Sequence, residues 1–141
     1  MESQILPEKT TRVSIGTEKY KTLIEAEGHK LVADEPVAVG GTGQGLNPFS
    51  LLLASLGSCG AITGRMYADR KHWPLDKIEI ELQILHRNQK GQEEDLIIKK
   101  VRLYGPLSPY QKKRIIEIID KCPVQKAIGD SLLIQSELMP V

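Results

Sequence analysis

Residues 47–64 read NPFSLLLASLGSCGAITG, and this segment decides the fold because it predicts a long helix without a charged face. Asn47 can accept hydrogen bonds from the first amides of a helix. Pro48 suits the first helical position, where its missing N–H would have no partner. The first charged residue after them is Arg65. A helix without a charged side is normally surrounded by protein, so we expect a central, buried helix.

One side of this helix carries small residues. Gly57, Gly60, Ala61 and Gly64 recur at spacings of three and four, which places them on one face. Glycine costs about 1 kcal/mol in a helix interior relative to alanine, so the pattern predicts a compensating close approach, most simply by another backbone. In a chain of this size the best candidate is a second copy. We hypothesise a dimer with this helix at or near the interface.

The segment before the helix predicts antiparallel β-structure. Val13 and Ile15 alternate with polar residues, and Glu27-Gly28 indicates a turn, so residues 10–35 predict a meander of two or three strands. Residues 35–46 contain four glycines and predict a loop.

The segment after the helix predicts a hairpin, a second helix and a last strand. Residues 77–85 alternate as in a half-buried strand, 88–95 are polar and predict its loop, and 96–104 return as the partner strand. Ser108-Pro109 opens a second helix by the same capping chemistry, and residues 131–138 predict a final strand. The expected class is therefore α+β, with antiparallel sheets around the central helix, in one domain over residues 1–141.

Cys122 is placed at a helix boundary. Pro123 cannot continue a helix, so the second helix should end before it, and a new turn beginning at Pro123 leaves Cys122 at the N-cap. The positive end of a helix, with Lys121 and Lys126 nearby in sequence, favours a thiolate. A helix-ending residue without chemistry is the alternative.

Cys59 lies on the central helix, where a small apolar core residue is the simplest interpretation. Ser55 and Thr63 lie four residues away on either side, and their hydroxyls could stabilise a thiolate. Arg65 lies about 240° round the helix from Cys59, so an activating cation must come from another element or another chain.

The composition excludes several classes of function. Hydrophobic residues make up 40% and charged residues 26%, and 19 basic against 18 acidic residues give a net charge of +1 without a basic block. A nucleic-acid footprint is therefore not expected. The two cysteines and three histidines lack the CxxC or HxxxH spacing of a zinc site. The GGTGQG run lacks the lysine and hydroxyl residue of a phosphate-binding loop.

The chain also lacks the marks of export. Residues 1–9 have no apolar core of the signal-peptide kind, and the longest strongly apolar run, 51–56, is too short to span a bilayer. We expect a soluble cytoplasmic protein. In a reducing compartment its two cysteines would be free thiols or a redox pair.

Several motifs together resemble the OsmC/Ohr family. They are the run from Asn47 to Cys59, Arg65-Met-Tyr-Ala, Lys71-His-Trp-Pro-Leu and Asp120-Lys-Cys-Pro-Val. The separation of the two cysteines and the order of the expected elements also fit, so the resemblance covers essentially the whole chain.

The resemblance implies an intertwined homodimer of α+β subunits with central helices enclosed by sheet. It implies a thiol peroxidase acting on organic hydroperoxides, with Cys59 as the peroxidatic cysteine and Cys122 as the resolving one. The oxidised enzyme would hold a Cys59–Cys122 disulfide, which an external dithiol, lipoyl-type in some members, would reduce. Neither a metal nor an organic cofactor is implied.

The chain departs from the family at one point. The hydroperoxidases carry a glutamate directly after the Asn-Pro, paired with an arginine from the N-terminal strands, whereas Phe49 stands here. Arg12, Lys19 and Lys21 are the basic candidates in the N-terminal strands. Without a cation, Cys59 should stay largely protonated at pH 7, so we expect weak peroxidase activity or a different substrate.

Two other interpretations stay open. The first is a dimeric binding module that holds a small apolar or electrophilic ligand without turnover. The second is a purely structural protein.

Overall fold

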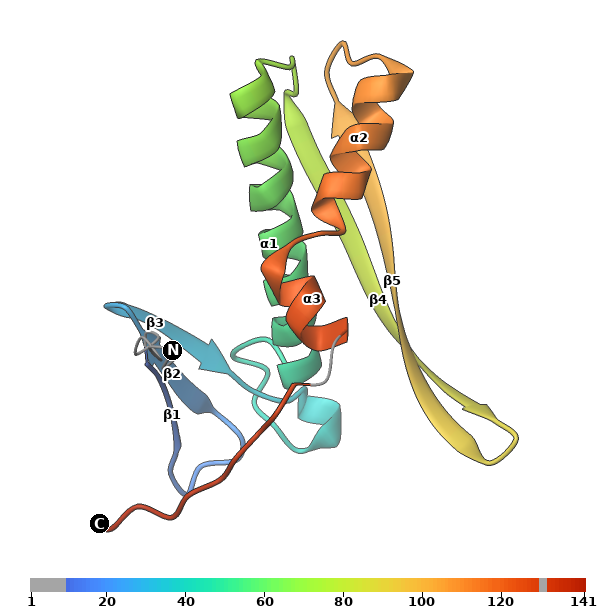
Figure 1. The fold of residues 1–141 in the computed structure, drawn as a ribbon. Helices are drawn as coiled ribbons and strands as arrows, with labels where there is room; N and C mark the ends of the chain where they lie inside the picture. The colour runs from blue at the N-terminus through green and yellow to red at the C-terminus, as the bar shows by residue number, and fades with distance from the viewer. Residues whose placement is uncertain (1–9, 130–131) are drawn as a thin grey trace, which may run out of the picture. The chain divides into compact units, whose positions relative to one another are not determined.

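The computed structural model describes residues 10–129 and 132–141, which form an α+β fold of two antiparallel sheets and three α-helices (Figure 1). Of the described residues, those from 10 to 51 belong to one compact unit and those from 52 onward to a second. We call them the first and the second unit, and each is described by itself.

The first unit contains the predicted meander. Strands β1 (Thr11–Ile15), β2 (Thr22–Ala26) and β3 (His29–Ala33) pair antiparallel in the order β1-β2-β3. The β2–β3 turn consists of Glu27 and Gly28, whose φ angles of 53° and 81° both lie in the left-handed region. Such a two-residue turn matches the twist of the strands that it joins, which confirms the turn expected from the sequence.

The glycine-rich loop after β3 is organised by one carboxylate. Asp34 is only 2% exposed. It accepts hydrogen bonds from the backbone N–H groups of Glu35 (2.8 Å), Thr42 (3.3 Å) and Gln44 (3.2 Å), and from the Thr42 hydroxyl. The loop predicted over 35–46 is confirmed, with a short 3-10 helix at Val37–Val39, and its backbone is tied to a single buried charge.

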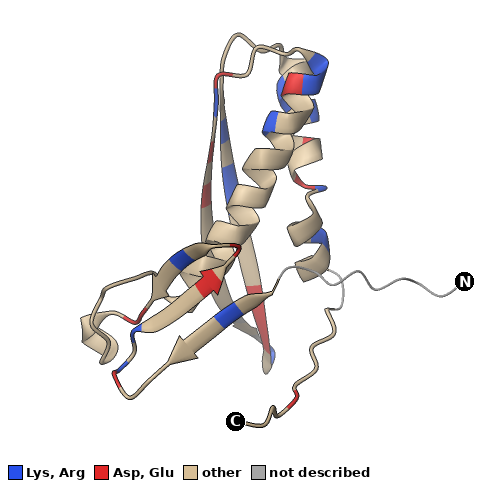
Figure 2. Cartoon of the chain, turned by 90° about the vertical axis from the view of Figure 1, so that its left-hand side faces the viewer, with Lys and Arg blue, Asp and Glu red and all other residues tan. Residues whose placement is uncertain are grey.

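The long helix α1 (Pro48–Lys71) begins where the sequence predicts. The Asn47 side chain accepts a hydrogen bond from the Ser50 N–H at 2.9 Å, and the Asn47 carbonyl accepts the first helical bond from Leu51. The helix is 24 residues long and carries its charged residues only at its C-terminal end (Figure 2).

In the second unit, strands β4 (Lys77–Gln89) and β5 (Gln92–Tyr104) form an antiparallel hairpin of 13 residues a side. Lys90 and Gly91 make the turn, with φ angles of 53° and 78°. The loop predicted over 88–95 was therefore wrong. A turn of this kind needs only two residues, so the polar residues around it continue the strands instead.

The hairpin has one apolar and one charged face. The apolar face consists of Ile78, Ile80, Leu82 and Ile84 on β4, opposite Leu103, Val101, Lys99 and Ile97 on β5. On the other face Arg102 pairs with Glu81 at 2.7 Å and with Glu79 at 3.5 Å. Helices α1 and α2 (Pro109–Ile119) cover the apolar face, where the core residues Tyr67, Ala68, Ile115 and Ile119 are buried (Figure 1).

The small-residue face of α1 packs against its own chain. A methyl group on Gly57 would lie 2.8 Å from Leu82 Cδ1, and one on Gly60 would lie 3.0 Å from Ile119 Cγ2. The expectation that a second backbone fills this face was therefore wrong. Side chains of β4 and α2 fill it, because the hairpin folds back onto the helix.

The opposite side of α1 is open in a single chain. Leu52, Ile62 and Met66 are 37%, 54% and 67% exposed. Within residues 10–129 and 132–141 of one chain the helix is not enclosed on all sides as expected, because the hairpin and α2 cover only one face. By length and composition α1 could cross a membrane, but a core helix of a water-soluble protein meets the same criterion. Its packed glycine face is typical of a core helix.

Helix α2 and the short helix α3 (Pro123–Gly129) begin as predicted. Ser108 and Gln111 form a capping box at the start of α2. Residues 132–138 form no strand, which corrects the last predicted element over its described part; Ser131 lies outside the described residues. Within the described part of the chain these residues pair with no other strand, so their backbone lacks the ladder hydrogen bonds that define a strand.

Candidate functional site

The centre of the candidate site is Cys122, which lies at the start of α3 and is fully buried. Its carbonyl accepts the Lys126 N–H at 3.1 Å, and its sulfur accepts the Gln125 N–H at 3.4 Å. The predicted N-cap position of Cys122 is confirmed, and the thiol itself is the capping group.

Cys59 lies on α1 beside Cys122. It is half-buried, both cysteines are free thiols, and Cys59 lies near enough to Cys122 to raise the pKa of the Cys122 thiol. Two thiols that are far apart in sequence are therefore neighbours within the second unit.

The pKa of the Cys122 thiol reflects opposing influences. Burial is the largest and raises the pKa, because it disfavours the charged thiolate. The Gln125 N–H lowers it, the neighbouring Cys59 raises it, and the positive charge of Lys99 lowers it. The net direction is upward, so this thiol depends on its polar neighbours to ionise.

Lys99 is the functional candidate that the sequence analysis missed. Its side chain on β5 is only 13% exposed. Its Nζ donates to Asp120 Oδ1 at 2.8 Å and also to Gln125 Oε1. The signal was present in the pattern of alternate residues Ile97, Lys99, Val101 and Leu103, where a lysine occupies an apolar position.

A small pocket adjoins this network. It has a volume of about 160 Å³ and combines apolar walls with a polar end; it is lined by Leu56, Ile97, Lys99, Gln125, Ile128 and Gly129. Leu56 precedes Cys59 by one helical turn on α1. A small ligand with an alkyl part and a polar head matches such a lining.

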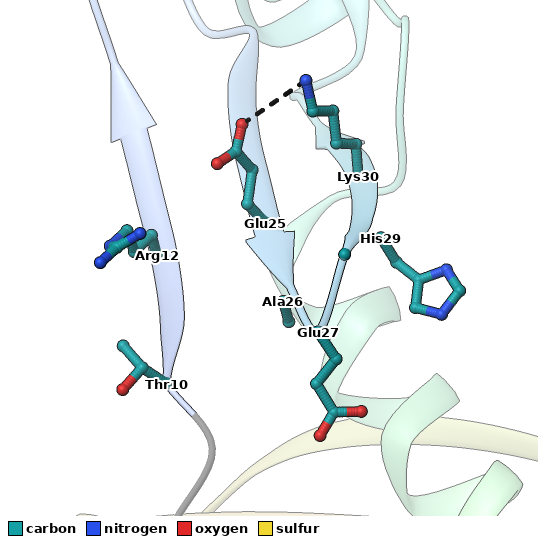
Figure 3. A pocket seen from close by; sticks show the side chains of 8 residues that line it. Thr10, Arg12, Glu25, Ala26, Glu27, His29 and Lys30 are labelled. Carbon is teal, nitrogen blue, oxygen red and sulfur yellow. Dashed lines mark ion pairs between the residues drawn. The ribbon is translucent and has the colours of Figure 1, made fainter.

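The other predicted cations lie elsewhere. Lys121 and Lys126 are exposed, and the cation that acts on Cys122 is Lys99. Arg12, on β1 of the first unit, lines a separate pocket of about 240 Å³, where Glu25 and Lys30 form an ion pair at 3.9 Å (Figure 3). Lys19 and Lys21 lie between β1 and β2 in the same unit. Ser55 is exposed and Thr63 is half-buried.

Within residues 10–129 and 132–141, no group of three or more His, Cys, Asp and Glu side chains is arranged to hold a metal ion.

Comparison with known protein families identifies the class of protein to which this fold and its two cysteines belong. The model of the OsmC-like protein family matches residues 41–137, a range that includes both cysteines. The chain belongs to the OsmC-like protein family.

Solved structures of similar fold agree with this assignment. An OsmC-like protein from Mycoplasma pneumoniae is 16% identical, with 87% of this chain and 88% of that chain covered and a TM-score of 0.74. An organic hydroperoxide resistance protein OsmC from Legionella pneumophila is 18% identical, with 89% and 91% covered and a TM-score of 0.65.

An organic hydroperoxide resistance protein from Elizabethkingia anophelis is 13% identical, with 89% and 90% covered and a TM-score of 0.66. At these identities the likeness concerns the fold. No curated protein matches the chain.

Proposed function

We propose that this protein is a thiol-dependent peroxidase that reduces organic hydroperoxides, with Cys59 as the peroxidatic and Cys122 as the resolving cysteine. The observation that carries the proposal is the proximity of the two thiols to each other, near a small pocket in the second unit. Family membership supports it, as do the names of the relatives from Legionella pneumophila and Elizabethkingia anophelis.

The proposed chemistry balances without a metal or an organic cofactor. The Cys59 thiolate attacks the terminal oxygen of the hydroperoxide, an S–O bond forms, the O–O bond breaks, and the alkoxide leaves and is protonated to the alcohol. The Cys122 sulfur then attacks the Cys59 sulfenic acid, so that an S–S bond forms and water leaves. An external dithiol reduces the disulfide by thiol–disulfide exchange, and the family resemblance implies a lipoyl-type dithiol for some members.

The pocket bears on the class of substrate. Leu56, Ile97 and Ile128 supply apolar walls, which favour an alkyl or aryl hydroperoxide over hydrogen peroxide. Burying one methylene group contributes about 0.8 kcal/mol to the binding free energy. A hydroperoxide with a few such groups should therefore bind here more tightly than hydrogen peroxide, which has none.

The test is turnover of cumene or tert-butyl hydroperoxide with a dithiol, for the wild type, Cys59→Ser and Cys122→Ser. Cys59→Ser should abolish turnover. Without the dithiol, Cys122→Ser should still consume about one equivalent of peroxide per chain and then stop at the Cys59 sulfenic acid, because no resolving thiol is present. A wild-type protein that consumes no hydroperoxide, although both of its cysteines are reduced, would contradict the proposal.

A second function is favoured by the residue after the Asn-Pro. Phe49 replaces the carboxylate that the family resemblance implies, and the Cys122 thiol is buried with a raised pKa. Both features suit a dimeric module that binds a small apolar or electrophilic ligand without turnover. Covalent capture of an electrophile, without peroxide consumption by the wild type, would favour this module.

We further propose that the whole chain works as one domain within a homodimer in the cytoplasm. The family match runs from residue 41 to 137 and so crosses the boundary between the two units. The open face of α1 and the exposed apolar residues 132–134 are surfaces that a second copy could cover. Two free thiols suit a reducing compartment.

A further inference from the structure

Lys99 is a charged residue on an apolar surface. In the register of the hairpin it lies opposite Leu82, between the pairs Ile80–Val101 and Ile84–Ile97. Among positions 78, 80, 82 and 84 of β4 and 97, 99, 101 and 103 of β5, it is the one charged side chain. Lysine is almost never buried unless it is paired, so its place in this sheet face calls for partners.

Its partners connect three elements around one thiol. The Nζ atom donates to the Asp120 carboxylate at the end of α2 and to the Gln125 side chain on α3. The backbone N–H of the same Gln125 donates to the Cys122 sulfur. Lys99 therefore holds in place the residue that hydrogen-bonds the thiol.

The charge of Lys99 is only partly cancelled at this site. Asp120, its acidic partner, has a side chain that is 53% exposed, against 13% for Lys99. Water screens the exposed carboxylate more than the buried ammonium group, so a positive potential persists toward Cys122. Among the described residues, the Cys59 thiol is the other titratable group that acts on Cys122, and Lys121 and Lys126, which are near it in sequence, are exposed.

We propose that Lys99 is a positioning residue for the resolving step: it stabilises the Cys122 thiolate and holds Gln125 against it. The inference rests on the proposed peroxidase function. When a hydroperoxide has oxidised Cys59, the Cys122 thiolate attacks the Cys59 sulfur, the S–S bond forms, the S–O bond breaks, and the departing hydroxide is protonated to water. Lys99 thus supplies, from β5 of the same chain, a cation for the second cysteine.

The first experiment measures ionisation of Cys122 without any peroxide. In the Cys59→Ser protein, the ultraviolet absorbance of the thiolate is titrated against pH, with the protein lacking both cysteines as the blank. Adding Lys99→Met should shift this titration to higher pH, so that the thiolate fraction at a fixed pH on the rising part of the curve falls by about threefold, whereas Lys99→Arg should preserve the curve. Lys100→Met removes an exposed charge from the adjacent position of β5 and should change nothing.

Asp120→Asn makes this test decisive. Loss of the carboxylate leaves the Lys99 charge less neutralised, so the thiolate fraction should rise where Lys99→Met makes it fall. A purely structural network predicts changes in the same direction, because either substitution would loosen α3. Same-direction changes, or a Lys99→Met profile equal to that of Lys100→Met, would overturn the inference.

The second experiment measures resolution in the protein with both cysteines. After one equivalent of cumene hydroperoxide, Cys59 sulfenic acid is trapped with dimedone and the disulfide is quantified by mass spectrometry. Lys99→Met should form the disulfide about threefold more slowly and accumulate more sulfenic acid. If the wild type forms neither species, the peroxidase proposal fails, while the titration still decides the role of Lys99.

Discussion

At the scale of single residues, charges with little contact with water organise both units. Asp34 in the first unit and Lys99 in the second are each held by several hydrogen bonds. An unpaired buried charge costs several kcal/mol, so such residues persist only where their partners are complete. Asp34 meets its need with backbone N–H groups and a hydroxyl, and Lys99 with two side-chain oxygens.

Asp34 makes the loop over residues 35–46 sensitive to acid. The Thr42 hydroxyl is the largest influence on the Asp34 carboxyl and lowers its pKa. Burial raises this pKa, whereas the N–H groups of Gln44, Glu35 and Thr42 lower it. The result is a pKa far below the usual range of a carboxyl group. A lowered folded-state pKa gives stability that is present above the unfolded value of about 3.9 and is lost as pH falls below it.

Hydrogen exchange of the Thr42 and Gln44 amides checks this prediction. After correction for intrinsic rates, protection in the wild type should be constant down to about pH 4 and should decline below it. Asp34→Asn should lower protection throughout and remove the acid-dependent part, because an amide donates where these groups need an acceptor. Equal protection in the two proteins at neutral pH would contradict the role given to Asp34.

At the scale of elements, α1 and the hairpin determine each other's sequence. The glycines of α1 leave room for Leu82, Ile80 and Ile78, which lie at alternate positions of β4. Glycines spaced three and four residues apart on the helix therefore contact side chains spaced two residues apart on the strand. We call this line of contacts the seam between α1 and β4. The contact explains why glycines persist in the middle of a helix despite their low helix propensity.

Gly64→Ala tests this seam. The added methyl would lie 2.9 Å from Ile78 Cδ1 and 3.0 Å from Ile119 Cγ1, and Ile119 is fully buried. Overpacking costs about 1–3 kcal/mol and the gain in helix propensity returns about 1 kcal/mol. We expect urea denaturation to show a net loss of about 1 kcal/mol.

Gly129→Ala is the matched control for Gly64→Ala, because no atom lies within 4 Å of its added methyl. It should leave the free energy of unfolding unchanged or slightly higher. A Gly64→Ala protein as stable as the wild type would mean that Ile78 and Ile119 can move aside.

At the scale of the whole molecule, the uncovered apolar surface of α1 is the feature to explain. Leu52, Ile62 and Met66 lie on a helix whose other face is packed, and Leu133 and Ile134 near the C-terminus are 88% and 83% exposed. Exposed apolar side chains that gather on one element mark an interaction surface more often than scattered ones do.

Sedimentation velocity tests the proposed homodimer. The wild type should sediment as a dimer at micromolar concentration, and Ile62→Lys with Met66→Lys should shift it toward monomer. Substituting an exposed residue of a monomer changes the free energy of unfolding by only about 0.5 kcal/mol. A shift from dimer to monomer on sedimentation would therefore identify these two residues as part of an interface. A monomeric wild type at micromolar concentration would contradict the dimer.

The elements that the sequence predicts correctly depend on interactions between near neighbours. Asn47-Pro48 and Ser108-Pro109 start their helices, Glu27-Gly28 makes its turn, and Pro123 leaves Cys122 at an N-cap. Capping and turn formation involve residues one to four positions apart, so the local sequence contains the whole interaction. The α+β class and the family resemblance follow from the same local patterns in order.

Tertiary contacts decided the rest, because they join residues that the sequence keeps far apart. The partner of the glycine face, the full length of the hairpin and the proximity of Cys59 to Cys122 depend on how β4, β5 and α2 fold back onto α1. Lys99 is the clearest case. In the sequence, Lys99 is a charged residue at an apolar position of the alternating pattern of β5. Its hydrogen bonds to Asp120 and Gln125 form only when β5, α2 and α3 come together in the folded chain.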